Sequence, residues 1–119
     1  MKMRKNKVQF NYDHPVVIAE IGCNHQGNIN FAKKLLISAS QCGVKVAKFQ
    51  KRNNKELLTK LQYNTPHPNP VNSFGESYGA HREFLEFDIK QHKELKLFAE
   101  ELGLVYSTSV WDITSAKEI

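Results

Sequence analysis

The chain has 119 residues, 40% of them hydrophobic and 24% charged, which fits one domain and excludes a disordered chain. No apolar run approaches the ~18 residues of a membrane-spanning helix, and no apolar stretch follows the basic start to form a secretory signal. The two cysteines, Cys23 and Cys42, supply neither a CxxC pair nor a disulfide framework. The net charge of +5 is scattered beyond the basic segment 1–15, which fits a solvated surface or an anionic small-molecule substrate.

The first predicted elements alternate between strand and helix. Residues 8–12 alternate apolar and polar side chains, which predicts a short strand. The β-branched apolar run at 16–22 ends in glycine and predicts a buried strand. Asn28 and Asn30 are candidate N-caps for a helix over 31–42, which Gly43 ends, and a second strand covers 44–50. Strand, helix and strand of this length fit a right-handed βαβ unit.

Residues 51–87 interrupt this alternation. The stretch holds Pro66, Pro68 and Pro70 together with glycines and asparagines, and it predicts a long connection without regular structure, either functional or disordered. Within it, the segment 75–83 combines glycines with Tyr78 and Arg82. Such a segment fits a lid over an anionic substrate, and it fits an ordinary surface loop as well.

The alternation then resumes. Asp88 and Gln91 predict a capping box at the start of a helix that Gly103 ends, residues 104–110 predict a third strand, and residues 114–119 begin like a helix. This order predicts an α/β fold with a parallel sheet and helices outside it. Three strands with an open edge make an unfinished core, so we expect the chain to be a truncated part of a larger domain.

Candidate site residues lie at the strand ends, because ligands of parallel α/β folds bind beyond the carboxyl ends of the strands. Alternation places Glu20 of the first strand on a common inner face with Lys48 and Gln50 of the second. A carboxylate and an ammonium cost several kcal/mol to bury unless they are paired or bound to a ligand. Either a salt bridge that closes the end of the sheet or a binding site satisfies this pattern. Thr108 ends the third strand.

The remaining polar residues predict no metal or nucleotide site. His25, in a turn rich in glycine and asparagine, fits a ligand, a base or a structural side chain, and His67, His81 and His92 show no paired ligand spacing. Neither common glycine-rich phosphate motif is present. Cys23 has no histidine partner in the pattern, which favours a small packed side chain.

Four segments resemble the sialic acid synthases. They are Ala19–Gly27 (AEIGCNHQG), Val46–Gln50 (VAKFQ), Tyr78–Glu86 (YGAHREFLE) and Ser107–Asp112 (STSVWD). The first two, in this order and at this distance, form a specific signature. The resemblance covers residues 16–119.

This resemblance implies a (β/α)₈ TIM barrel, of which the chain holds about the first three β/α units. The family condenses phosphoenolpyruvate with an N-acetylmannosamine-type sugar to give a nonulosonic acid and phosphate. C3 of phosphoenolpyruvate attacks the open-chain aldehyde, water adds at C2, and the intermediate loses phosphate by C–O cleavage. A divalent metal, Mn²⁺ or Mg²⁺, polarises the aldehyde. The full-length enzymes are homodimers, often with a small antifreeze-like domain that reaches into the partner's site.

The resemblance also implies roles for residues. Glu20 holds the sugar or handles a proton, and Lys48 pairs with phosphoenolpyruvate as a catalytic residue. The expected substrate-binding residues are Gln50 at the mouth of the site, Thr108 on the phosphate, Asn24 and His25 in the first loop, and Tyr78 and Arg82 as lid contacts.

The family's metal-binding histidines and a second phosphoenolpyruvate lysine lie later than residue 119. We therefore expect metal ligands outside this chain, no activity of the chain alone, a cytoplasmic location, and no nucleic-acid or membrane partner. Two alternatives stay open. One is another phosphoenolpyruvate-condensing barrel acting on a phosphorylated sugar, and the other is a non-catalytic binding module.

Overall fold

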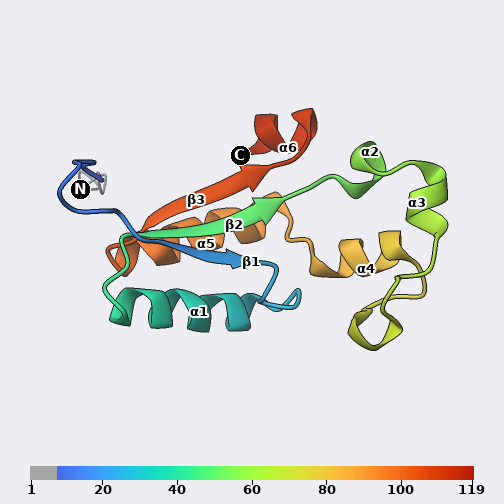
Figure 1. The fold of residues 1–119 in the computed structure, drawn as a ribbon, viewed down its shortest axis with the longest axis horizontal. Coiled ribbons are helices and arrows are strands. Elements are labelled where there is room, and N and C mark those ends of the chain that lie inside the picture. Colours follow the sequence, from blue (N-terminus) through green and yellow to red (C-terminus); the bar gives the residue numbers. More distant parts are fainter. Residues whose placement is uncertain (1–7) are drawn as a thin grey trace.

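The computed structural model describes residues 8–119, which contain a three-stranded parallel sheet. Strands β1 (Ile18–Gly22), β2 (Val46–Lys51) and β3 (Val105–Val110) lie in the order β1-β2-β3 (Figure 1). Helix α1 (Ile29–Gln41) connects β1 to β2, and helix α5 (Ile89–Glu101) precedes β3. The predicted α/β fold with a parallel sheet is confirmed.

Local sequence signals set the ends of the two long helices. The Asn28 side chain caps α1 by accepting hydrogen bonds from the backbone N–H groups of Asn30 and Phe31. Asp88 and Gln91 form the predicted capping box of α5, with both reciprocal bonds present. Gly43 and Gly103 follow α1 and α5, each with a φ of +77°. A left-handed residue of this kind ends a helix at little cost only when it is glycine.

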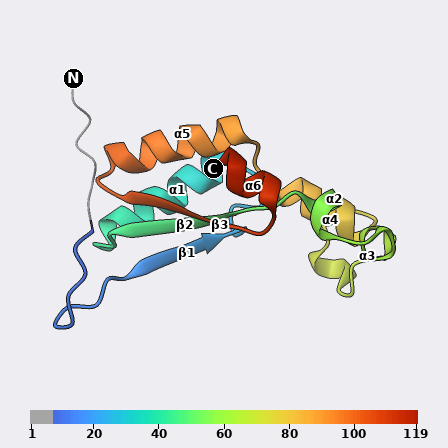
Figure 2. The ribbon, with the colours of Figure 1, turned by 90° about the horizontal axis from the view of Figure 1, so that it is seen from above.

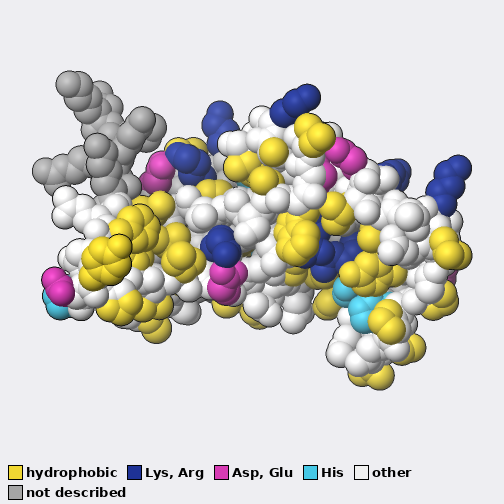
Figure 3. Space-filling model, turned by 45° about the horizontal axis from the view of Figure 1, so that its top comes forward, with side chains coloured by type: hydrophobic (Ala, Val, Ile, Leu, Met, Phe, Trp, Pro, Cys, Tyr) yellow, Lys and Arg dark blue, Asp and Glu magenta, His cyan; other side chains and the backbone are white. Residues whose placement is uncertain are grey.

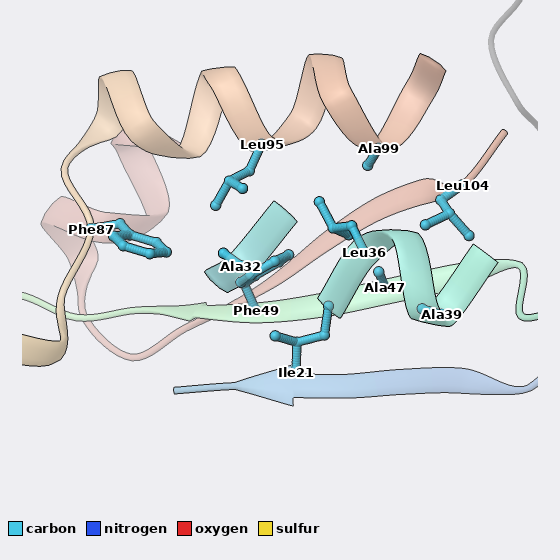
Figure 4. Packing of buried hydrophobic residues seen from close by; sticks show 10 residues of the cluster. All are labelled: Ile21, Ala32, Leu36, Ala39, Ala47, Phe49, Phe87, Leu95, Ala99 and Leu104. Carbon is cyan, nitrogen blue, oxygen red and sulfur yellow. The ribbon is translucent and has the colours of Figure 1, made fainter. Parts of the chain in front are cut away.

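Both long helices cover the same face of the sheet (Figure 2). Ala47 and Phe49 of β2 point towards the helices and are fully buried against Leu36 of α1 and Leu95 of α5 (Figure 4). The core cluster consists of Ile21, Ala32, Leu36, Ala39, Ala47, Phe49, Phe87, Leu95, Ala99 and Leu104. The opposite face of the sheet, which carries Glu20, Lys48 and Gln50, is called the open face below.

The strand predicted over residues 8–12 is absent, so that prediction was wrong. Phe10 and Tyr12 are 79% and 107% exposed, and within the described residues β1 pairs only with β2. An alternating pattern forms a strand only where a neighbouring strand can take up its backbone hydrogen bonds. For the same reason β1 begins at Ile18 rather than at residue 16. Residues 1–7 of the predicted basic segment lie outside the described residues.

Residues 51–87 are not the structureless connection that was predicted. They contain the short helices α2 (Asn54–Leu57), α3 (Lys60–Asn64) and α4 (Tyr78–Leu85) and the 3₁₀ helix η1 (Pro70–Asn72). Thr59 and Gln62 form a capping box, and the Ser77 side chain caps α4. Helices of one or two turns are too short to show a repeating apolar face, so periodicity missed them. This α2–α4 segment lies beyond the carboxyl ends of the strands (Figure 1).

Helix α6 (Ile113–Glu118) follows β3, as predicted, and Asp112 caps it. None of the helices within residues 8–119 has the length and apolar character required to span a membrane.

Candidate functional site

Glu20 and Lys48 form an ion pair on the open face. They are register partners in β1 and β2, and Lys48 Nζ lies 2.5 Å from Glu20 Oε1. The Glu20 side chain is 60% exposed and that of Lys48 29%, so the pair contributes only about 0–1 kcal/mol to stability. The salt bridge expected from a purely structural interpretation is present. Both side chains of the pair are accessible to a ligand, and the stability of the fold does not depend on the ion pair.

The open face continues past this pair towards the ends of β2 and β3. The register places Ser107 beside Lys48 and Ser109 beside Gln50. The Arg52 guanidinium donates a hydrogen bond of 2.9 Å to Gln50 Oε1 and lies 4.1 Å from the centroid of the Trp111 ring. Two hydroxyls, an amide and a guanidinium therefore line the same face as Lys48.

Arg52 was not among the residues predicted from the sequence. The alternation that selected Lys48 and Gln50 reaches Arg52 two residues later, but the predicted strand ended at residue 50. In the structure β2 runs to Lys51, and the alternation continues one residue beyond it. Extending the same counting rule by one step finds the residue.

Arg82 of α4 reaches the same site from the α2–α4 segment. Its Nη2 lies 3.5 Å from Cys23 Sγ and 3.9 Å from Glu86 Oε1, and Cys23 Sγ lies 3.8 Å from Gln50 Oε1. Cys23 is therefore not simply a packed side chain, because it lies between Arg82 and Gln50. The predicted lid residue Arg82 belongs to a helix rather than to a flexible loop.

Glu86 links the two arginines. Its Oε2 accepts a hydrogen bond of 3.0 Å from the backbone N–H of Arg52, and its side chain is 10% exposed. Burial raises the pKa of Glu86, although the hydrogen bond from Arg52 and the nearby cations oppose this. Burial and then the charge of Arg82 lower the pKa of Arg52. Arg52, Arg82 and Glu86 form one charged cluster at the carboxyl ends of β1 and β2.

The first loop is shaped by Asn24 and His25. Asn24 Nδ2 donates to the Ile21 carbonyl at 2.9 Å, and His25 Nδ1 accepts from the Gly27 N–H at 3.1 Å. The His25 ring is 2% exposed, stacks on Phe87 at 4.0 Å between centroids, and has its pKa lowered to about 4 by burial. The enclosed ring shapes the loop and does not face the open side, and its expected substrate contact stays a prediction.

Thr108 lies near the end of β3, as predicted, and its expected contact with the phosphate stays a prediction. Its register partner is Phe49, and the neighbouring Tyr106 stacks on Phe49 at 5.5 Å between centroids. Thr108 therefore lies on the helix-covered face, where its Oγ1 is buried, while Ser107 and Ser109 face the Lys48 side. The position of Thr108 at the strand end was predicted correctly, but its face follows from the register, which the sequence alone did not supply.

Tyr78 is the first residue of α4, and its ring lies 6.0 Å from that of His81. It interacts electrostatically with Arg52, which places it at the edge of the same cluster. In residues 8–119, no group of three or more His, Cys, Asp or Glu side chains is arranged to hold a metal ion.

Two hollows lie near the site without including the ion pair. One of about 300 Å³ is lined by Lys51 and Arg52 and by the carboxylates Glu83, Glu86, Asp88 and Glu118. One of about 400 Å³ lies between α5, β3 and α6 beside His92. In the space-filling view, basic side chains lie in a depression between hydrophobic ones (Figure 3).

The sequence is similar to one known protein family and to several of its characterised members. The model of the NeuB family matches residues 35–119. The N-acetylneuraminate-9-phosphate synthase of Mus musculus is 40% identical over 100 residues, covering 83% of this chain and 28% of that protein. The N,N'-diacetyllegionaminic acid synthase of Campylobacter jejuni is 33% identical over 100 residues, covering 84% and 30%. The chain thus spans less than a third of the length of these relatives.

The fold has a solved counterpart. The crystal structure of N-acetylneuraminic acid (sialic acid) synthetase from Leptospira borgpetersenii, in complex with citrate, superimposes with a TM-score of 0.68 at 23% sequence identity. The match covers 93% of this chain and 36% of that one. At this identity the comparison supports the fold and the order of its elements.

Proposed function

Because the chain belongs to the NeuB family, we propose that it is the part of a synthase that condenses phosphoenolpyruvate with an N-acetylmannosamine-type sugar, giving a sialic-type acid and phosphate. We further propose that its sheet is the first part of a (β/α)₈ TIM barrel. The parallel strand order and the helices on one face support this architecture. In a closed barrel, the open face would line the interior.

The observation that carries the proposal is the Glu20–Lys48 pair on the open face. The Lys48 ammonium would hold the phosphate or carboxylate of phosphoenolpyruvate as a point charge. An anion that takes over Lys48 releases the Glu20 carboxylate, which is then free to bind a sugar hydroxyl or to move a proton near the reacting carbon. Gln50, Ser107 and Ser109 add hydrogen-bonding groups along the same face.

In the proposed reaction, C3 of phosphoenolpyruvate attacks the aldehyde of the open-chain sugar and forms the new C–C bond. Water adds at C2, and the tetrahedral intermediate expels phosphate by C–O cleavage. The negative charge on the phosphate increases as the bond breaks, so a fixed cation beside it stabilises the transition state more than the ground state. Lys48 is the residue of this chain assigned to that role.

A divalent metal, Mn²⁺ or Mg²⁺, would polarise the sugar aldehyde. The described residues do not fit such an ion, because they provide no group of three or more potential ligands. We propose that the metal is bound by other parts of the enzyme, and that the 119-residue chain is therefore inactive alone. Homodimer formation and a cytoplasmic location stay predictions.

The test is the substitution Lys48→Ala in the synthase. It should lower kcat/KM for phosphate release from phosphoenolpyruvate and N-acetylmannosamine by about 10²–10³-fold, the effect of removing one stabilising group from the transition state. Lys45→Ala is the matched control, because Lys45 carries the same charge and is exposed just before β2. Near-normal rates for Lys48→Ala, with an unchanged circular dichroism spectrum, would contradict the role of Lys48.

The sugar acceptor can be either phosphorylated or unphosphorylated. The relatives are named for a phosphorylated product in one case and for an unphosphorylated one in another. Comparing rates with N-acetylmannosamine and its 6-phosphate distinguishes the two acceptors. A full-length protein that binds both without turnover in the presence of either metal would instead be a non-catalytic binding module.

A further inference from the structure

We propose that Arg52 and Arg82 form a subsite for a phosphate monoester, adjacent to Lys48 but separate from it. The subsite deepens the proposed function and rests on it for the identity of the ligand. Its existence, however, is argued from the side chains themselves.

The first argument is the poor hydrogen bonding of Arg82. Its side chain is only 11% exposed, yet its closest polar partners are a thiol 3.5 Å away and a carboxylate oxygen 3.9 Å away. A guanidinium carries five N–H donors, and a thiol is a weak acceptor. Its Nε, like that of Arg52, is buried without a hydrogen-bond partner. A nearly buried cation with so few acceptors is unfavourable unless a ligand supplies more.

The second argument is charge. The charge of Arg82 contributes, after burial, to the lowered pKa of Arg52. Glu86 contacts both residues, through the Arg52 backbone N–H and the Arg82 guanidinium. A network with a purely structural role would pair each guanidinium with its own carboxylate. Here Arg82 meets Glu86 only at 3.9 Å, and the Arg52 guanidinium donates to the neutral Gln50, so both can take an anion. Planar guanidiniums match the oxygens of a phosphate.

The third argument is position. Arg52 lies one residue beyond the end of β2 and four residues beyond Lys48, so in extended chain the two Cα atoms are roughly 13 Å apart. The Arg52 guanidinium lies over the Trp111 ring and donates a hydrogen bond to Gln50 Oε1. These two contacts fix its orientation before any ligand binds. A phosphate held there comes either from a phosphorylated sugar acceptor or from phosphoenolpyruvate bound towards the mouth of the site.

Cys23 provides the readout for a binding experiment. Its Sγ lies beside Arg82 Nη2 and Gln50 Oε1, so an anion at the subsite should shield the thiol from a neutral alkylating reagent. Cys42, exposed at the carboxyl end of α1, is an internal control in the same molecule. The alkylation rates of both thiols are measured by mass spectrometry with inorganic phosphate, phosphoenolpyruvate, N-acetylmannosamine 6-phosphate or unphosphorylated N-acetylmannosamine present.

We expect phosphate and the phosphate monoesters to slow alkylation of Cys23 and leave Cys42 unchanged. Arg52→Gln should raise the phosphate concentration needed for half protection about tenfold, since it removes a charged hydrogen-bond donor. Lys55→Gln, which removes an exposed charge from α2, is the matched control and should change nothing. Arg52→Lys, which keeps the charge but loses the planar fork, should give an intermediate value.

The comparison of esters identifies the source of the phosphate. Protection at a lower concentration of the sugar phosphate assigns the subsite to the acceptor, and the reverse order assigns it to phosphoenolpyruvate. Absence of Cys23 protection by any phosphate compound, or unchanged protection in Arg52→Gln, would overturn the subsite. Protection of Cys23 in a full-length synthase that shows no condensation would instead retain the subsite and reject the proposed reaction.

Discussion

Gly27 occupies a position where two constraints coincide. Its φ is +71°, and a Cβ built on it would lie 2.3 Å from the backbone oxygen of Phe84. The first constraint disfavours any L side chain, and the second requires the backbone of α4 to move. Gly27 therefore allows the loop after β1 to approach α4 closely, which keeps Cys23 near Arg82.

We predict that Gly27→Ala destabilises the chain by about 2–4 kcal/mol, because it adds a backbone clash to the strain of a left-handed residue. Gly43→Ala is the matched control, since Gly43 has a φ of +77° but no atom within 4 Å of its Cβ position. It should cost only about 1 kcal/mol. Urea unfolding of both variants measures the difference, and equal losses would show that the contact with Phe84 relaxes freely.

The buried histidines predict how stability depends on pH. Burial lowers the pKa of His25 and that of His92 from 6.5 to about 4. The unfolded chain therefore binds more protons than the folded chain between these pH values, so stability is full above about pH 6.5 and falls as the pH drops towards 4. The loss approaches about 3 kcal/mol for each ring.

Urea unfolding at a series of pH values measures this slope. His25→Asn should remove about half of it, because an amide oxygen can still accept from the Gly27 N–H but carries no proton in this range. An unchanged slope in that variant would mean that other groups cause the acid sensitivity.

Single residues also show how far sequence alone reaches. Alternation placed Glu20, Lys48 and Gln50 on one face correctly, because each lies inside a strand whose apolar partners mark the other face. It did not place Thr108, since the residues of β3 are all partly buried or exposed and no clear apolar set marks its inner side. Arg82 was selected from its segment, but its contact with Cys23 depends on a tertiary approach that no local pattern encodes.

At the scale of elements, Asp112 connects the exit of β2 to α6. It accepts hydrogen bonds from the Asn53 N–H at 2.6 Å and from the Ser115 N–H and hydroxyl at 2.7 and 2.8 Å. Asp112 thus serves as the cap of α6 and as a tether for the residue that follows Arg52. Both functions help to fix the mouth of the site.

We predict that Asp112→Ala costs about 2–3 kcal/mol, since it removes a helix cap and leaves a second backbone donor without its partner. Asp88→Ala is the comparison, because Asp88 caps α5 without a bond to a distant element and should cost about 1 kcal/mol. Thermal unfolding of the two variants gives the ranking. An equal cost would mean that the link to Asn53 contributes nothing measurable.

The elements that sequence predicted are the long ones. Helices α1 and α5 carry caps, several turns of apolar spacing and a terminal glycine, so three independent signals agree. The α2–α4 segment carries caps alone, and its helices are stabilised by contacts such as the Tyr63 ring against Gly79. Such packing between short helices is a tertiary effect, and it explains why periodicity found only a loop.

At the scale of the whole molecule, both β1 and β3 are edge strands of the described sheet, and the open face carries exposed apolar residues including Ile18 and Trp111. Unpaired backbone groups beside apolar side chains promote association. We predict that the isolated 119-residue chain self-associates as its concentration rises, which sedimentation velocity measures. A monomer at all accessible concentrations would contradict this.

Trp111 gives the molecule an intrinsic fluorescent reporter. It is the single tryptophan of the sequence, and the guanidinium of Arg52 lies over its ring at 4.1 Å. Intrinsic tryptophan emission therefore reports on one place in the chain. An anion that draws Arg52 off the indole should change the intensity or the wavelength of that emission, so ligand binding can be followed optically without any label.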